Sequence, residues 1–383
     1  MNARRAGSAG AALVTHAALA LAVALTAVAA PRAPLAAQER EADRFVAVDS
    51  LIAVKMEADG IPGLSIAIAL DGGPIFARGY GLADVEDSVP VTPETVFRSA
   101  SIGKPLTATA VMQLEERARI ELDAPIQRYC PAFPRKRATI TARHLLAHLS
   151  GIRHYGGPRN DEELFNTRHY TSVVDALEIF ADDPLLHEPG DRYLYSTFGY
   201  NVLGCVIEGA AGKRYLDYMA RHVFEAAGMT STRDDDPYAV IPHRAAGYRR
   251  VDGKLRHARR VDMSSKLPAG GFVTTASDLV AFASALMDGT LVSPETFERM
   301  LTPQTTTAGD PVPYGLGLGL FPDELGYGER EAFHGGGTPG VSGMLYLLPE
   351  RRFAVAILMN LEGVSDRVAL TAEIARVVLA LRN

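Results

Sequence analysis

The stretch FRSASIGKPLTATAVMQL, residues 97–114, places Ser101 three positions before Lys104. Proline is tolerated only near the start of a helix, so we expect a helix over residues 106–117 with Pro105 in its first turn. Ser101 then lies at or just before the helix N-terminus. Residues three apart share one face of a helix, with about 5–6 Å between their Cβ atoms, so the lysine amine can reach the serine hydroxyl.

Two interpretations of this pair are open. Serine alone is a poor nucleophile, but a desolvated lysine with a lowered pKa can act as its base. The competing interpretation is a serine that caps the helix, because Ser is common at helix starts and S-x-x-K often arises by chance. Of the six lysines in the chain, only Lys104 has a serine three positions before it, which favours the nucleophile.

The longer stretch FRSASIGKPLTATAVMQLEERARIELDAPIQRY, residues 97–129, resembles the first motif of a known family. This is the serine β-lactamase-like hydrolase family, which comprises the class C β-lactamases, DD-peptidases, esterases, D-amino-acid peptidases and LACTB-like proteins. The resemblance implies that Ser101 is the acylated nucleophile and Lys104 its partner. Gly103 departs from the Ser or Thr that is common at its position.

A second motif of the family supplies a tyrosine that acts as acid or base. HEPGDRYLYSTFGYNVLG, residues 187–204, is similar to it and implies that Tyr195 is this residue, followed by Ser196 and Thr197. Many members have Tyr-x-Asn, whereas Tyr-Ser-Thr is typical of the LACTB-like branch. The missing Asn amide argues against efficient β-lactam hydrolysis but not against acyl chemistry. The nearby Tyr193 and Tyr200 are expected to be structural.

The third motif of the family is Lys-Thr-Gly on an edge strand. EAFHGGGTPGVSGML, residues 331–345, resembles it, with His334-Gly335-Gly336 in place of that triplet. Glycines let a substrate approach the strand backbone closely. The resemblance implies that the N–H of Gly337 and that of Ser101 form the oxyanion hole. A histidine is charged or neutral according to its surroundings, so a substrate carboxylate is held less obviously than by lysine.

Strand patterns occur at both ends of the chain and helical patterns in the middle. An apolar β-branched run and a Gly-Gly turn predict a hairpin near residues 63–80, and further strands are expected at 314–321, 341–350 and 351–360. The fold class is therefore α/β of the α+β type, with an antiparallel sheet flanked by helices and a mostly helical insert. The sheet region covers about residues 41–100 and 263–383, and the helical region about 101–262.

The N-terminus has the pattern of a secretory signal peptide over residues 1–37: basic residues, an apolar Ala-rich run and small residues. An uncleaved membrane anchor is the alternative, but a run of Ala is less apolar than such an anchor needs. We therefore expect an exported protein, periplasmic or secreted, with residues 38–383 as one catalytic domain and no stable membrane span after cleavage. The net charge of −6 argues against nucleic acid as a partner.

Other site types have little support in the sequence. An exported protein could pair Cys130 with Cys205, but Cys205 lies in an apolar helical pattern that favours a buried, unpaired cysteine, so the disulfide is kept as the less favoured alternative. The chain lacks CxxC and HExxH, so no metal or cofactor is expected, and it lacks the G-x-S-x-G of α/β-hydrolases. His148 and Ser150 are expected to be structural, with a Ser–His catalytic pair as a weaker alternative.

The best-supported function is an exported serine hydrolase that forms an acyl-enzyme on an ester, amide or peptide bond. A β-lactamase is the alternative within the family, and a catalytically weak binding or scaffolding protein is the alternative of another class. The partner is then a small-molecule or peptide substrate, while the oligomeric state is not predicted. Residues 153–188 and 233–262 are expected to line or cover the cleft, with His154 and Tyr155 at its rim.

Overall fold

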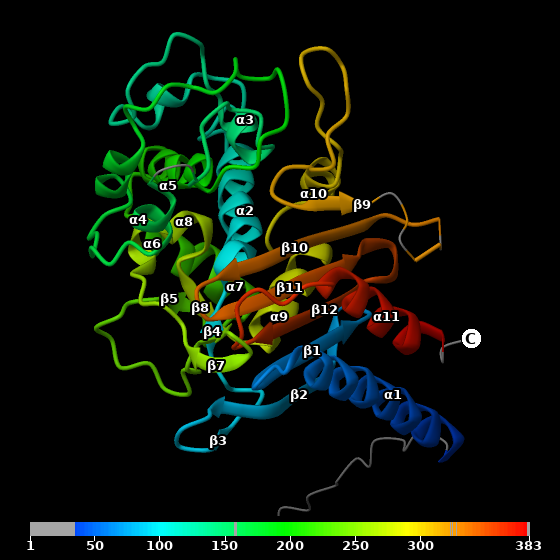
Figure 1. Ribbon diagram of the computed structural model, residues 1–383. Helices are drawn as coiled ribbons and strands as arrows, with labels where there is room; N and C mark the ends of the chain where they lie inside the picture. Colours follow the sequence, from blue (N-terminus) through cyan, green and yellow to red (C-terminus); the bar gives the residue numbers. More distant parts are fainter. Residues whose placement is uncertain (1–34, 157–158, 322, 324, 327, 381–383) are drawn as a thin grey trace, which may run out of the picture.

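A seven-stranded antiparallel sheet forms the centre of the computed structural model, which describes residues 35–156, 159–321, 323, 325–326 and 328–380 (Figure 1). Most of the predicted signal peptide lies outside these residues. The first strand pairs with the last, with Ile66 opposite Ile357, so both ends of the chain build the sheet. Across the sheet the strands are β3 (Val89–Pro90), β2 (Gly73–Asp84), β1 (Gly63–Leu70), β12 (Phe353–Met359), β11 (Val341–Leu348), β10 (Glu331–Thr338) and β9 (Gly319–Phe321).

The two faces of the sheet differ because side chains alternate along each strand. One face carries large side chains such as Ile66 and Ile357, and helices α1 (Leu35–Asp59) and α11 (Arg367–Ala380) cover it. The other face carries small side chains, among them Ala67, Ala69, Ala354 and Ala356. These alanines let α9 (Ala276–Met287) pack closely against β1 and β12.

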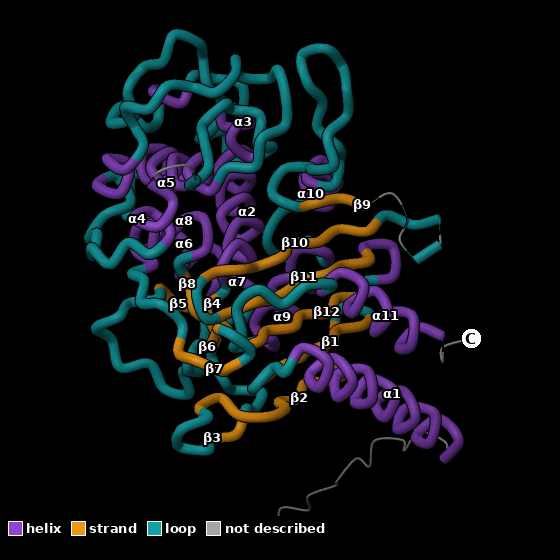
Figure 2. The backbone as a smooth tube through the Cα atoms, in the orientation of Figure 1, coloured by secondary structure: helices purple, strands orange, loops and turns teal. Residues whose placement is uncertain are grey.

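The helical region lies beside the sheet and holds more loop than the sequence predicts (Figure 2). Three short strands, β5 (Arg233–Asp234), β6 (Tyr248–Val251) and β7 (Lys254–His257), lie within residues 101–262, which the sequence predicts to be mostly helical. The remaining helices are α2 (Gly103–Glu116), α3 (Ala142–Leu146), α4 (Asn160–Leu164), α5 (Thr197–Ala211), α6 (Tyr215–Met219), α7 (Glu225–Ala227), α8 (Leu267–Gly270) and α10 (Pro294–Met300). The remaining strands are β4 (Phe97–Arg98) and β8 (Phe272–Thr274).

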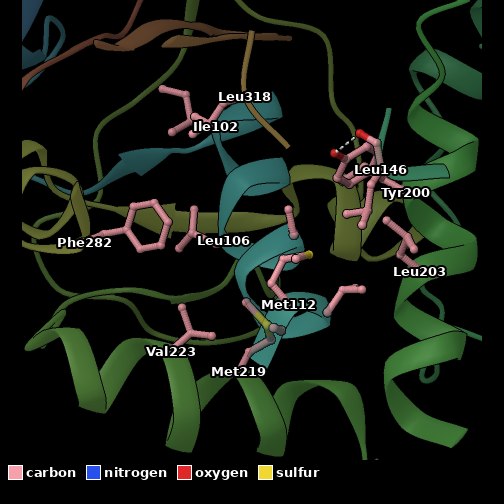
Figure 3. Close-up of a cluster of buried hydrophobic side chains, with 14 of the residues drawn as sticks. Ile102, Leu106, Met112, Leu146, Tyr200, Leu203, Met219, Val223, Phe282 and Leu318 are labelled. Atoms are coloured by element: carbon pink, nitrogen blue, oxygen red, sulfur yellow. Dashed lines mark hydrogen bonds between the residues drawn. The ribbon is translucent and has the colours of Figure 1, made fainter. Parts of the chain in front are cut away.

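Helix α2 lies inside the helical region, and its residues from Gly103 to Leu114 are buried. Figure 3 shows Leu106 and Met112 of this helix among the side chains of neighbouring elements, including Phe282 of α9. Burying each such side chain contributes about 1.5–3 kcal/mol. This packing holds the N-terminus of α2 at the junction between the helices and the sheet. The fold class is as predicted from the sequence, and none of the described helices is both long and apolar enough to cross a membrane.

The expectation of unpaired cysteines is wrong, because Cys130 and Cys205 form a disulfide with their Cα atoms 5.4 Å apart. Cys205 and Gly209 lie one turn apart on the same face of α5. A Cβ at Gly209 would lie 1.7 Å from the carbonyl oxygen of Tyr129, so only glycine lets α5 rest directly on that backbone. This close approach brings Cys130 to Cys205. The sequence pattern correctly placed Cys205 in a buried helix but could not show what packs against it.

The disulfide gives a stability prediction, because it joins positions 75 residues apart and restricts the unfolded chain. Replacing both cysteines with serine is expected to lower the free energy of unfolding by about 2–4 kcal/mol. Guanidinium unfolding with and without reductant measures the effect. Reductant should destabilise the native protein and leave the double variant unchanged; a native protein that is equally stable after verified reduction would contradict the prediction.

Candidate active site

Ser101 lies in a single 3₁₀ turn, Ala100–Ile102, directly before α2. The backbone of this turn is unusual, since Ala100 has a positive φ of 46°. Helix α8 packs against it so closely that a Cβ at Gly270 would lie 1.9 Å from the carbonyl oxygen of Ala100. A Cβ at Gly103 would in turn lie 2.6 Å from the Cα of Gly270. Gly103, unusual beside the family pattern, is thus required by this contact between backbones.

The Nζ atom of Lys104 lies 2.9 Å from the Oγ of Ser101. It also lies 3.2 Å from the Oγ1 of Thr197 and 3.3 Å from the carbonyl oxygen of Ala269. The side chain is completely buried, and no carboxylate of the described residues forms an ion pair with it. Burial therefore lowers the pKa of Lys104 well below its ordinary value, which favours the neutral amine.

A neutral amine has two N–H groups and one lone pair. The carbonyl of Ala269 can only accept a hydrogen bond, and the hydroxyl of Thr197 is itself placed to donate to Tyr155, 3.5 Å away. Ala269 and Thr197 can thus accept the two hydrogens of a neutral Lys104. The lone pair then faces the hydroxyl of Ser101, which is the arrangement that a general base requires.

Tyr195 borders the same serine. Its ring centroid is 4.9 Å from the Nζ of Lys104 and 4.2 Å from the ring of His148. Burial raises the pKa of Tyr195 well above its ordinary value, and a hydrogen bond with Ser101 partly opposes this shift. Tyr195 is therefore a protonated phenol that can give up its proton only to a strong base, such as a leaving group that is taking on negative charge.

The two residues after Tyr195 hold the loop in place. Ser196 is the N-cap of α5: its Oγ accepts a hydrogen bond from the amide of Gly199 at 2.9 Å and donates to the carbonyl of Arg153 at 2.8 Å. The amide of Thr197 donates to the Nδ1 of His154 at 3.1 Å. Thr197 thus stands where many relatives have Asn, and here it holds the lysine.

His148 supports this loop rather than activating Ser150. Its Nδ1 accepts a hydrogen bond from the amide of Ser196 at 3.1 Å, whereas the hydroxyl of Ser150 accepts one from the amide of Ile152. Four tyrosine rings surround the imidazole: those of Tyr193, Tyr195, Tyr200 and Tyr314. The structure therefore offers no Ser–His pair at this position.

Strand β10 carries the predicted third motif past the serine turn. A Cβ at Gly336 would lie 2.6 Å from the carbonyl oxygen of Ser99, so glycine is needed where the strand passes this turn. His334 is buried, and its Nδ1 donates to the carbonyl of Gly335 at 2.8 Å. Its Nε2 accepts from the hydroxyl of Tyr314 at 2.9 Å. Burial and the nearby Lys104 lower the pKa of His334 to about 3, so the imidazole is neutral.

In the structure, Ser101 and Lys104 of the first predicted motif contact the second motif, residues 195–197. The third motif, residues 334–337, packs against the serine turn. Three contacts of the site were not predicted: the carbonyl of Ala269, the hydroxyl of Tyr314, and Arg367, which donates to the carbonyl of Gly336. The sequence partly indicates the contact of Ala269, because the adjacent Gly270 and Gly271 are typical of a close approach between backbones. It does not indicate the contact of Arg367, which lies about 30 residues beyond the strand that it contacts.

Comparison with known proteins identifies the family. The model of the family described as Beta-lactamase matches residues 48–379. The chain belongs to the Beta-lactamase family. Among curated relatives, the human protein "Serine beta-lactamase-like protein LACTB, mitochondrial" is 31% identical over 418 residues, which is 82% of this chain and 76% of that protein. The "Putative penicillin-binding protein PbpX" of Bacillus subtilis is 31% identical over 258 residues, or 67% and 61% of the two chains.

Solved structures agree with the assignment. The D-amino acid amidase from Ochrobactrum anthropi SV3 has a TM-score of 0.74 at 25% identity, covering 89% of this chain and 100% of that one. The octameric penicillin-binding protein homologue from Pyrococcus abyssi has a TM-score of 0.75 at 27% identity, covering 88% and 77%. The resemblance stated from the three sequence motifs is therefore confirmed at the level of family and fold.

Burial of Lys104 predicts a pH dependence of stability. Between its lowered folded pKa and its ordinary value of 10.5, the unfolded chain binds a proton that the folded protein does not. The stability of the native protein relative to Lys104→Met should therefore rise with pH by up to about 1.4 kcal/mol per unit. Urea unfolding from pH 7 to 9.5 measures this difference, with Lys254→Met, an exposed lysine outside the cleft, as the control.

The native protein and Lys104→Met share their other titratable groups, such as Lys266. The pH dependence that these groups give to the unfolding free energy therefore cancels in the difference. His334 does not contribute in this range, because its pKa of about 3 lies far below it. A pH-independent difference between the native protein and Lys104→Met would show that the amine is charged in the folded state. That result would contradict its assignment as a base.

Proposed function

We propose that this protein is a serine hydrolase that works through an acyl-enzyme on an ester, amide or peptide bond. The observation that carries the proposal is the 2.9 Å contact between Ser101 and the buried, uncompensated amine of Lys104. A neutral lysine against a serine hydroxyl is the arrangement of a nucleophile with its base.

Acylation begins when the Oγ of Ser101 attacks the substrate carbonyl and its proton passes to Nζ of Lys104. The N–H groups of Ser101 and Gly337 hold the oxygen that becomes negative. Tyr195 gives its proton to the leaving alcohol or amine and regains one through Lys104. Water then attacks the acyl-enzyme and gives a proton to Lys104, which is neutral again. Lys104 passes this proton to the Oγ of Ser101 as the bond between Ser101 and the acyl group breaks.

The relatives support hydrolysis of an acyl bond but differ in substrate. One solved neighbour is a D-amino acid amidase, and curated relatives include proteins named as penicillin-binding. In this chain Thr197 stands where many members have Asn, and the neutral His334 stands where they have Lys. Both changes favour an esterase or a D-amino-acid-peptidase-like activity over a β-lactamase.

We also propose that residues 38–383 form one exported catalytic domain. The N-terminal pattern of basic, apolar and small residues supports export. The disulfide between Cys130 and Cys205 supports it independently, because disulfides persist mainly in oxidising compartments.

An active-site label tests the nucleophile. A fluorophosphonate should add one adduct to the native protein by intact mass, and Ser101→Ala should abolish the adduct. Ser150→Ala is the matched control, because Ser150 is a second buried serine of the same region that the mechanism does not use. Labelling that persists in Ser101→Ala would overturn the assignment.

Turnover separates an enzyme from a binding protein on the same fold. Tyr195→Phe should lower the steady-state rate on an alkyl ester such as ethyl butyrate by about 10²–10⁴, the usual range for a lost general acid or base, because the departing alkoxide needs a proton. Labelling of Ser101 should persist in this variant. If the native protein is acylated once but does not turn over any ester, the binding or scaffolding alternative is favoured instead.

A further inference from the structure

An aromatic pocket of about 350 Å³ adjoins the site on the side of Tyr195. Its walls include Tyr193 from the helical region, Tyr314 from the segment before β9, and Phe321 and Phe333 from strands β9 and β10. The rings of Phe321 and Phe333 stack with centroids 4.0 Å apart. The volume is within the range of small-molecule sites.

Cations are missing from this pocket. No lysine or arginine is among the described residues that line it, and its histidine, His334, is neutral. Burial raises the pKa of Tyr193 to about 12, so that side chain is also uncharged at neutral pH. An anion placed here would lose its hydration without gaining a counter-ion, which is costly.

The position of Tyr195 identifies which part of a substrate enters this aromatic pocket. The residue that protonates the leaving group must lie on the side of the scissile bond where that group departs. Tyr195 itself lines the pocket, so the leaving group extends into it. This step rests on the proposed function.

We propose that this enzyme takes esters or amides whose leaving group is uncharged and aromatic or otherwise apolar. Peptides ending in a free carboxylate, and penicillins, place that carboxylate on the leaving side and are therefore poor substrates. The specificity comes from the aromatic walls together with the neutral His334.

A matched pair of substrates tests the proposal. Methyl 4-acetoxybenzoate and 4-acetoxybenzoate share the acetyl group and differ in the charge of the phenol that leaves. After each kcat/KM is divided by the rate of hydroxide-catalysed hydrolysis, the neutral ester should be preferred about tenfold or more, which corresponds to about 1.4 kcal/mol.

Two variants probe the pocket itself. His334→Lys introduces a cation and should reduce the preference about tenfold by improving the charged substrate. Phe321→Ala should lower kcat/KM for the aryl ester more than for ethyl acetate. The control is Phe76→Ala, which removes one ring of the stacked pair Phe45–Phe76 outside the cleft. If His334→Lys does not fold, Phe321→Ala still tests the pocket.

The outcomes separate this proposal from the one it rests on. Equal corrected rates for the two esters, with hydrolysis still abolished in Ser101→Ala, would overturn the pocket inference and leave the hydrolase in place. An equal loss on aryl and ethyl esters in Phe321→Ala would also overturn it. Absence of any acylation at Ser101 would instead overturn the proposed function.

A separate observation concerns Arg367, at the start of α11 on the sheet face opposite the serine. Its guanidinium donates to the carbonyl of Gly336 and covers the positions where Gly335 and Gly337 lack side chains. No carboxylate of the described residues forms an ion pair with it. A half-buried arginine without an acid needs a different reason for its position.

The peptide bond between Gly336 and Gly337 supplies that reason. Its carbonyl accepts from Arg367, and the trans geometry directs the N–H of Gly337 to the opposite side. A cation on the carbonyl polarises the whole peptide group and strengthens its N–H as a donor. We infer that Arg367 is a positioning residue that strengthens the Gly337 half of the oxyanion hole, which again rests on the proposed function.

The test compares transition-state and ground-state binding. Arg367→Gln should lower kcat about tenfold, leave KM within about twofold, and weaken a phenylboronic acid, which binds as a tetrahedral anion, in parallel with kcat. Arg367→Lys should retain part of the activity. Arg376→Gln, on the same helix but paired with Glu373, is the control. A lower melting temperature with unchanged kcat and boronate affinity would overturn the inference, whereas loss of fluorophosphonate labelling in the native protein would overturn the proposed function.

Discussion

The burial of the Lys104 amine without a carboxylate is the constraint on which the site depends. A neutral amine in a dry interior still needs hydrogen-bond partners, and here they come from three separate elements. The serine turn before α2, the start of α5 and the end of α8 supply Ser101, Thr197 and Ala269. The lysine therefore fixes the relative positions of these three elements, and each of them in turn keeps the amine neutral and aimed at the serine.

Holding three elements around one amine requires a rigid support, which the packing of α2 and the sheet provides. The serine turn lies between the backbones of α8 and β10, with Gly270 on one side and Gly336 on the other. Ala100 keeps its positive φ because both neighbours leave it no room to relax. A conformation that would cost about 1–3 kcal/mol alone persists only when its surroundings enforce it.

The sequence predicts the parts of this design that depend on local spacing. The i, i+3 relation of Ser101 and Lys104, the Tyr195 motif at the start of α5 and the glycines of β10 can each be recognised within a few residues. It does not predict the disulfide, the contact of Ala269 with Lys104, or Arg367, because each joins segments far apart in the chain. Likewise, residues 233–262 are included in the mostly helical region predicted over about 101–262, but tertiary packing selects loops and short strands there.

This chain has His334 where the third motif of the family has lysine, and this difference changes the electrostatics of the whole site. A permanent cation at that position would face Lys104 across the cleft and attract substrate carboxylates, whereas the neutral imidazole does neither. In the proposed mechanism, negative charge that develops on the substrate oxygen must then be met by backbone N–H groups alone. A guanidinium behind the strand, bound to the carbonyl of Gly336, strengthens one of those groups without exposing a cation to the substrate. Together, the two proposals describe a cleft that stabilises an anion formed during the reaction while disfavouring one that arrives with the substrate.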